Sequence, residues 1–62
     1  MPDTETLLET LISRRRGGRE TWDGLDLVER ARMLAYVDQA RLAHSRRNRA
    51  QELAFWLSLG PA

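Results

Sequence analysis

The feature that most constrains the fold of this chain is the spacing of its apolar residues, which recur every three to four positions in three separate segments. This spacing places apolar side chains on one face of an α-helix, and the alternation typical of a β-strand is absent. Glycines at positions 17 and 18, and a Gly-Pro pair at 60 and 61, are typical helix stops. The pattern predicts an all-α fold, a small three-helix bundle forming a single domain over 1–62, with helices at about 4–16, 26–43 and 46–58.

The first predicted helix, 4–16, is amphipathic. Asp3, Thr4 or Thr6 can cap its start, and the arginines at its end suit the negative end of the helix dipole. Its core-facing stripe is Leu7, Leu8, Leu11 and Ile12. Residues 17–25 are expected to form a loop. Within it, Trp22 either closes the open end of the bundle or stays exposed as an anchor for a partner, since Trp is a favoured residue at binding hot spots.

The second predicted helix, 26–43, carries apolar residues on two nearly opposite faces. One stripe holds Leu27, Val28, Ala31, Leu34, Ala35 and Leu42, and the other holds Met33, Tyr36, Val37 and Ala40. A helix that is apolar all round is normally buried, but a chain of 62 residues has little protein with which to cover both faces. Either this helix is the centre of the bundle, or one face meets another chain. We expect the first stripe to pack internally.

The third predicted helix, 46–58, begins after Ser45, which is a good N-cap residue. Its inward stripe is Ala50, Leu53, Ala54 and Leu57, flanked by Trp56. Phe55 and Leu59 point away from that stripe at helical spacing. They therefore add to the apolar surface that the bundle does not need for its own core.

The usual catalytic and metal-binding patterns are missing. The chain has no cysteine, and its one histidine, His44, is adjacent to Ser45, so the two side chains do not face each other as a nucleophile and base. We expect His44 to complement the C-terminal end of the second helix. No apolar run approaches the ~20 residues of a membrane span. Met1 to Glu5 lack the features of a secretory signal. We therefore expect a cytoplasmic protein, not an enzyme, with no catalytic residue, metal, cofactor, membrane contact or small-molecule substrate.

The surplus apolar surface favours a protein partner. Contiguous exposed apolar side chains usually mark interaction sites, and a small domain often gains stability by forming a dimer. The expected function is a protein-binding module, an inhibitor, adaptor or assembly factor, docking on a larger protein or on itself as a homodimer. The chain resembles many short, arginine-rich proteins of bacteria and phages, and a bacterial or phage-infected cell is the expected setting. The predicted protein-binding residues are Met33, Tyr36, Val37, Phe55, Trp56 and Leu59.

The alternative is a nucleic-acid-binding protein of the helix-turn-helix type. All ten basic residues are arginine, a side chain that contacts phosphates and base edges, although nine acidic residues reduce the net charge to +1. A recognition helix places Arg, Asn and Gln side chains from its first turns against base edges. The candidate residues are Arg14, Arg15, Arg16, Arg46, Arg47, Asn48, Arg49 and Gln51.

Overall fold

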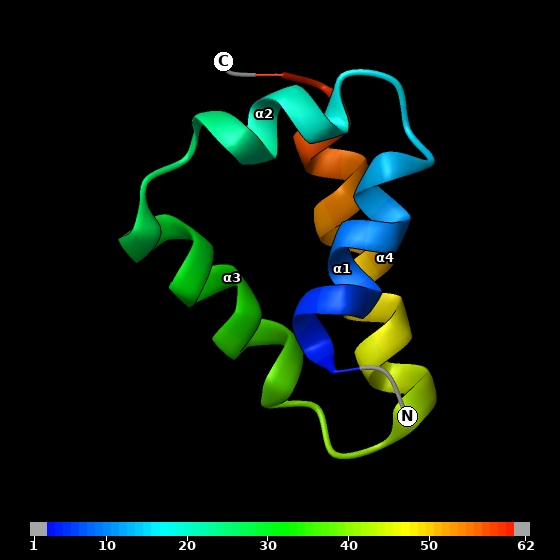
Figure 1. Cartoon of the computed structure of the whole chain (residues 1–62). Helices are drawn as coiled ribbons and strands as arrows, with labels where there is room; N and C mark the ends of the chain where they lie inside the picture. Colours follow the sequence, from blue (N-terminus) through cyan, green and yellow to red (C-terminus); the bar gives the residue numbers. More distant parts are fainter. Residues whose placement is uncertain (1–2, 61–62) are drawn as a thin grey trace.

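The computed structural model describes residues 3–60, and within that range all regular secondary structure is helical. Four α-helices follow one another: α1 (Thr4–Ser13), α2 (Gly18–Gly24), α3 (Leu27–Asp38) and α4 (Ala43–Ser58). Figure 1 shows the short α2 lying across one end of the arrangement, close to the end of α4. The all-α prediction is confirmed, but the described part of the chain has four helices where three were predicted.

The first helix is shorter than predicted. It starts after Asp3, whose carboxylate accepts a hydrogen bond from the backbone N–H of Thr6 at 2.7 Å. It ends at Ser13, because the chain then turns through Gly17, whose φ of 82° lies in the left-handed region that favours glycine. The predicted end at residue 16 is therefore wrong, since the arginines at 14–16 belong to the turn.

Residues 17–25 were predicted as a loop, and this is also wrong, because they contain the two turns of α2. Trp22 lies on this helix and is 2% exposed, so its predicted role of closing the bundle end is confirmed. Arg30 of α3 covers it from outside, donating from Nε to the carbonyl oxygen of Trp22 at 3.2 Å and from Nη2 to that of Asp23 at 2.9 Å.

The break between α3 and α4 lies earlier than predicted. α3 starts after the expected cap, Asp26, which accepts from the N–H of Glu29 at 2.8 Å, but it ends at Asp38 instead of residue 43. α4 starts at Ala43 instead of 46, with Leu42 and not Ser45 at its N-cap. His44 therefore lies in the first turn of α4, and the expectation that it complements the end of the preceding helix is wrong.

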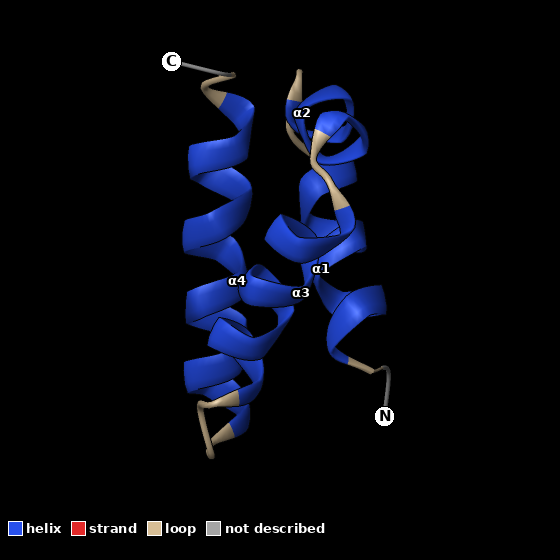
Figure 2. Cartoon of the chain, turned by 90° about the vertical axis from the view of Figure 1, so that its left-hand side faces the viewer, coloured by secondary structure: helices blue, strands red, loops and turns tan. Residues whose placement is uncertain are grey.

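The core lies where α1 and α4 run side by side and α2 and α3 contact both (Figure 2). The small side chains Ala50 and Ala54 let α4 approach its neighbours closely, and the predicted inward stripes of α1 and α4 are confirmed in the core. The buried members of this core are Leu8, Leu11, Ile12, Trp22, Val37, Ala50, Ala54 and Leu57.

The inward face of α3 is formed mainly by the stripe expected to be free, although Leu34 of the other stripe also packs against the core. Val37 is fully buried, and Met33 and Tyr36 pack against the core. Leu27 and Val28, from the stripe expected to be internal, are 81% and 59% exposed. The inward face carries the larger mid-helix side chains, whereas the outward face has alanines at 31 and 35. More apolar area is therefore removed from water in this orientation.

Candidate interaction surface

An exposed aromatic pair occupies the last turns of α4. Phe55 is 44% exposed and Trp56 is 60% exposed. Their rings meet edge to face, with centroids 5.8 Å apart and an interplanar angle of 71°. Leu59, one turn further along, is 60% exposed. All three residues were predicted from the sequence as partner-facing, and the structure leaves them accessible at the surface.

The turn after α1, which carries Arg14, Arg15 and Arg16, meets this pair through Arg15. The guanidinium carbon of Arg15 is 5.4 Å from the centroid of the Phe55 ring, which is the distance of a cation–π contact. The same turn approaches the end of α4, because a Cβ added at Gly17 would lie 3.6 Å from the carbonyl oxygen of Ser58. Within residues 3–60, none of these three arginines forms an ion pair or a side-chain hydrogen bond. We call this set the arginine–aromatic surface: Arg14, Arg15, Arg16, Phe55, Trp56 and Leu59.

A second exposed apolar region lies at the start of α3. Leu27 and Val28 are followed along the same face by the exposed alanines at 31 and 35. Acidic side chains surround the start of this helix, where Asp26 is the N-cap and Glu29 lies in the first turn. Sequence reasoning identified this stripe but assigned it to the core. No sequence signal separates two apolar stripes of one helix, because their placement depends on how neighbouring helices cross it.

Three residues predicted to bind a partner lie elsewhere. Val37 is fully buried and cannot reach a partner in this fold, which corrects its assignment to the surface. Tyr36 is partly buried and donates from its hydroxyl to Oε2 of Glu52 at 3.1 Å. Met33 is likewise partly buried against the core. These three side chains join α3 to the rest of the bundle instead of extending the arginine–aromatic surface.

The arginines at the start of α4 divide into two groups. Arg46 donates from Nε to the carbonyl oxygen of Ala40 at 2.8 Å, and Arg49 donates from Nη1 to that of Tyr36 at 2.7 Å. The Arg49 guanidinium also lies over the Tyr36 ring, 4.8 Å from its centroid. These two arginines therefore hold the end of α3 against α4. Arg47, Asn48 and Gln51 remain exposed.

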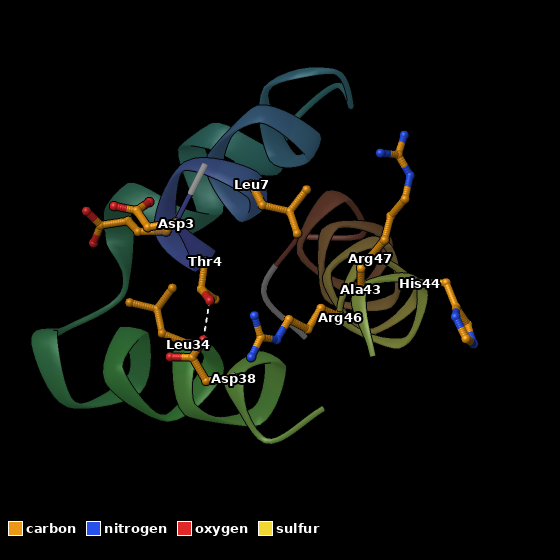
Figure 3. Close-up of a pocket in the computed structure, with 10 residues that line it drawn as sticks. Asp3, Thr4, Leu7, Leu34, Asp38, Ala43, His44, Arg46 and Arg47 are labelled. Atoms are coloured by element: carbon orange, nitrogen blue, oxygen red, sulfur yellow. Dashed lines mark hydrogen bonds between the residues drawn. The ribbon is translucent and has the colours of Figure 1, made fainter. Parts of the chain in front are cut away.

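An open hollow lies between the start of α1, the end of α3 and the start of α4 (Figure 3). Thr4 donates a hydrogen bond to the Asp38 carboxylate across it. In Figure 3, Arg46 reaches toward these two residues, whereas His44 and Arg47 point away. Hydrogen bonds from Thr6 hold the pKa of Asp3, at the hollow's rim, below its ordinary value. Because the lining combines carboxylates and arginines, it selects neither sign of charge. The lining residues are Asp3, Thr4, Glu5, Leu7, Leu34, Asp38, Ala43, His44, Arg46 and Arg47.

Residues 3–60 contain neither a cluster of metal-ligating side chains nor a membrane-spanning helix. No group of three or more histidine, aspartate or glutamate side chains there is arranged to hold a metal ion. None of the helices in that range combines the length and apolar character needed to cross a membrane. Comparisons with known protein families, curated protein sequences and solved structures find no match to this chain.

Proposed function

We propose that this chain is a non-enzymatic protein-binding module that docks through the arginine–aromatic surface. The observation that carries the proposal is the exposed Phe55–Trp56 pair with the Arg15 guanidinium against it. Aromatic and arginine side chains are the types most enriched at binding hot spots. A module of this kind acts by covering part of another protein, as an inhibitor, adaptor or assembly factor.

The energetics favour a buried state for this surface. Burying a large apolar side chain that is exposed in the free protein contributes about 1.5–3 kcal/mol, and Trp56, Leu59 and Phe55 are each 44–60% exposed. An exposed edge-to-face pair is already held in one geometry by its own contact, so less side-chain freedom is lost on binding.

The neighbouring charges specify the chemistry of the partner. Arg14, Arg15 and Arg16 are exposed and have no carboxylate partner within residues 3–60. A guanidinium pairs best with a carboxylate through two parallel hydrogen bonds. The surface therefore suits a protein patch that combines apolar side chains with aspartates or glutamates.

Trp56→Ala tests this proposal against a matched variant, Arg32→Ala, which changes an exposed side chain on α3. Partners are captured from host cells with the native chain, purified, and then titrated against each variant by calorimetry. Truncation of a hot-spot residue costs 2 kcal/mol or more, which corresponds to about 30-fold weaker binding. We expect that loss for Trp56→Ala and less than about threefold for Arg32→Ala. Equal affinity of Trp56→Ala and the native chain would refute the proposal.

A second candidate, nucleic-acid binding, is favoured by one observation. Arg47, Asn48 and Gln51 are exposed along the first half of α4, which follows α3 after the connection at 39–42. These are the side-chain types that contact base edges and phosphates. Fluorescence anisotropy with duplex and single-stranded DNA tests it, because such binding weakens steeply as salt rises. Absence of binding to either probe at low salt would eliminate this candidate.

A further inference from the structure

The chain carries a second surface that combines exposed apolar side chains with charge opposite to that of the arginine–aromatic surface. Residues 20–29 include four acidic side chains and no basic one. Among them lie Leu27 and Val28, which are 81% and 59% exposed. We call this set the acidic–aliphatic surface: Asp23, Asp26, Leu27, Val28 and Glu29. It offers exposed apolar side chains to the aromatic pair, and carboxylates to the three arginines that have no ion pair within residues 3–60.

Resting on the proposed function, we infer that the partner is a second copy of this chain, with the arginine–aromatic surface of each copy covering the acidic–aliphatic surface of the other. Five of the six large apolar side chains exposed within residues 3–60 belong to these two surfaces, the sixth being Leu42. Mutual docking thus covers five of these six side chains. A heterologous partner on one surface would leave the other exposed.

The carboxylates on the acidic–aliphatic surface are available for this exchange. Asp23 contacts Arg19 at 3.4 Å and Glu29 contacts Arg32 at 3.7 Å, but all four side chains are 48–74% exposed. Exposed pairs of this kind contribute little to stability, so a better geometry with another arginine displaces them easily. Asp26 caps α3 through one carboxylate oxygen, which leaves the other oxygen able to accept.

Helix α2 connects the regions of the chain that carry the two surfaces. The helix begins beside the end of α4 and leads through residues 25 and 26 to the start of α3 (Figure 1). Its two ends therefore adjoin the elements that carry the two surfaces. Its seven residues span about 10 Å. In the inferred dimer, a twofold axis near the middle of α2 relates the two copies, so that each surface meets its complement in the other copy. The same contact then forms twice, and the assembly closes as a dimer.

A charge exchange between two variants tests this inference. One variant carries Arg14→Glu and Arg15→Glu, and the other carries Asp23→Arg and Glu29→Arg. In each variant alone, the two facing surfaces have the same sign of charge, so we expect dimerisation to weaken by about tenfold or more. In an equimolar mixture, every contact between unlike variants pairs opposite charges, and we expect heterodimers to form. Light scattering and sedimentation measure the masses, and circular dichroism verifies that both variants remain helical.

The inference is supported if the native protein has a solution mass of twice the 7.2 kDa of one chain, if both variants lose the dimer, and if the mixture recovers it. A native chain that stays monomeric at high concentration overturns it, as does a native dimer that survives either variant. Failure of the mixture to recover dimers also overturns it, as does assembly that needs added nucleic acid. The proposed function stands in the monomeric case if a captured protein still loses affinity with Trp56→Ala, and it falls if that affinity is unchanged.

Discussion

The orientation of α3 decides which apolar face is free, and replacing Val37 tests that orientation directly. Val37 is fully buried, and Val37→Ala removes two methyl groups from the core. Each buried methylene equivalent contributes about 0.8 kcal/mol, and the cavity left behind adds a further cost. The free energy of unfolding should therefore fall by about 2 kcal/mol. A domain of 62 residues has about 3–9 kcal/mol of total stability. The melting temperature should therefore fall by about 8–16 °C.

Val28→Ala is the matched control, because it makes the same chemical change on the same helix at a side chain that is 59% exposed. Its effect should stay within about 0.5 kcal/mol, since alanine also has the higher helix propensity. Urea unfolding followed by circular dichroism measures both variants, at concentrations where light scattering shows monomers. If Val28→Ala costs as much as Val37→Ala or more, the stripe containing Leu27 and Val28 packs inward, and our assignment of the free face is refuted.

Three further predictions concern the helix ends. Gly18→Ala should lower the free energy of unfolding by about 1–2 kcal/mol in a thermal melt, because the added Cβ would lie 2.9 Å from the carbonyl oxygen of Ile12. Gly24→Ala is the control: its Cβ would have no atom within 4 Å, so stability should stay the same or rise by up to about 1 kcal/mol. Asp26→Ala removes the α3 cap and should lower the free energy of unfolding measured in urea by about 1 kcal/mol. Asp26→Asn keeps an acceptor and should lower it much less. Equal losses of stability would contradict a capping role. Because the hydrogen bonds from Thr6 lower the pKa of Asp3, its carboxylate stabilises the folded chain above the ordinary pKa of 3.8, and this stability is lost as pH falls through the folded pKa. An NMR titration of Asp3 should therefore give a midpoint below 3.8. A midpoint at or above 3.8 would contradict the hydrogen bond from Thr6.

The parts of the fold that were predictable are those with a single apolar stripe. α1 and α4 each have one, and their buried residues Leu8, Ile12, Ala54 and Leu57 follow from helical spacing alone. α2 was missed because its segment, Gly-Arg-Glu-Thr-Trp-Asp-Gly, is short, polar and bounded by glycines. A helix of this length is not stable by itself, and burial of Trp22 against the other helices is what stabilises it.

The break between α3 and α4 was misplaced for a similar reason. Ala40, Arg41, Leu42 and Ala43 include good helix formers, so local propensity favours continuing the helix. The break is instead stabilised from further along the chain, because arginines of α4 donate to the free carbonyl oxygens at positions 36 and 40. Such bonds satisfy acceptors that a helix end leaves without partners. They also explain why two arginines predicted to contact nucleic acid contact the chain itself.

The candidate surface was predictable only in its α4 part. Phe55, Trp56 and Leu59 lie off the inward stripe of their own helix, so their exposure follows from the sequence. That Arg15 lies against Phe55 follows only from the fold, because the turn at Gly17 brings two segments 40 residues apart into contact.

Leu27 illustrates how the proposed dimer accounts for the exposed apolar side chains. It occupies the first position of α3 and is 81% exposed, so within one copy it removes little apolar area from water. A polar residue at that position would serve the helix start equally well, since Asp26 already provides the cap. The folding of a single copy therefore gives no energetic reason for a large apolar side chain there. In the proposed dimer, the second copy covers Leu27 and removes its side chain from water, which supplies such a reason.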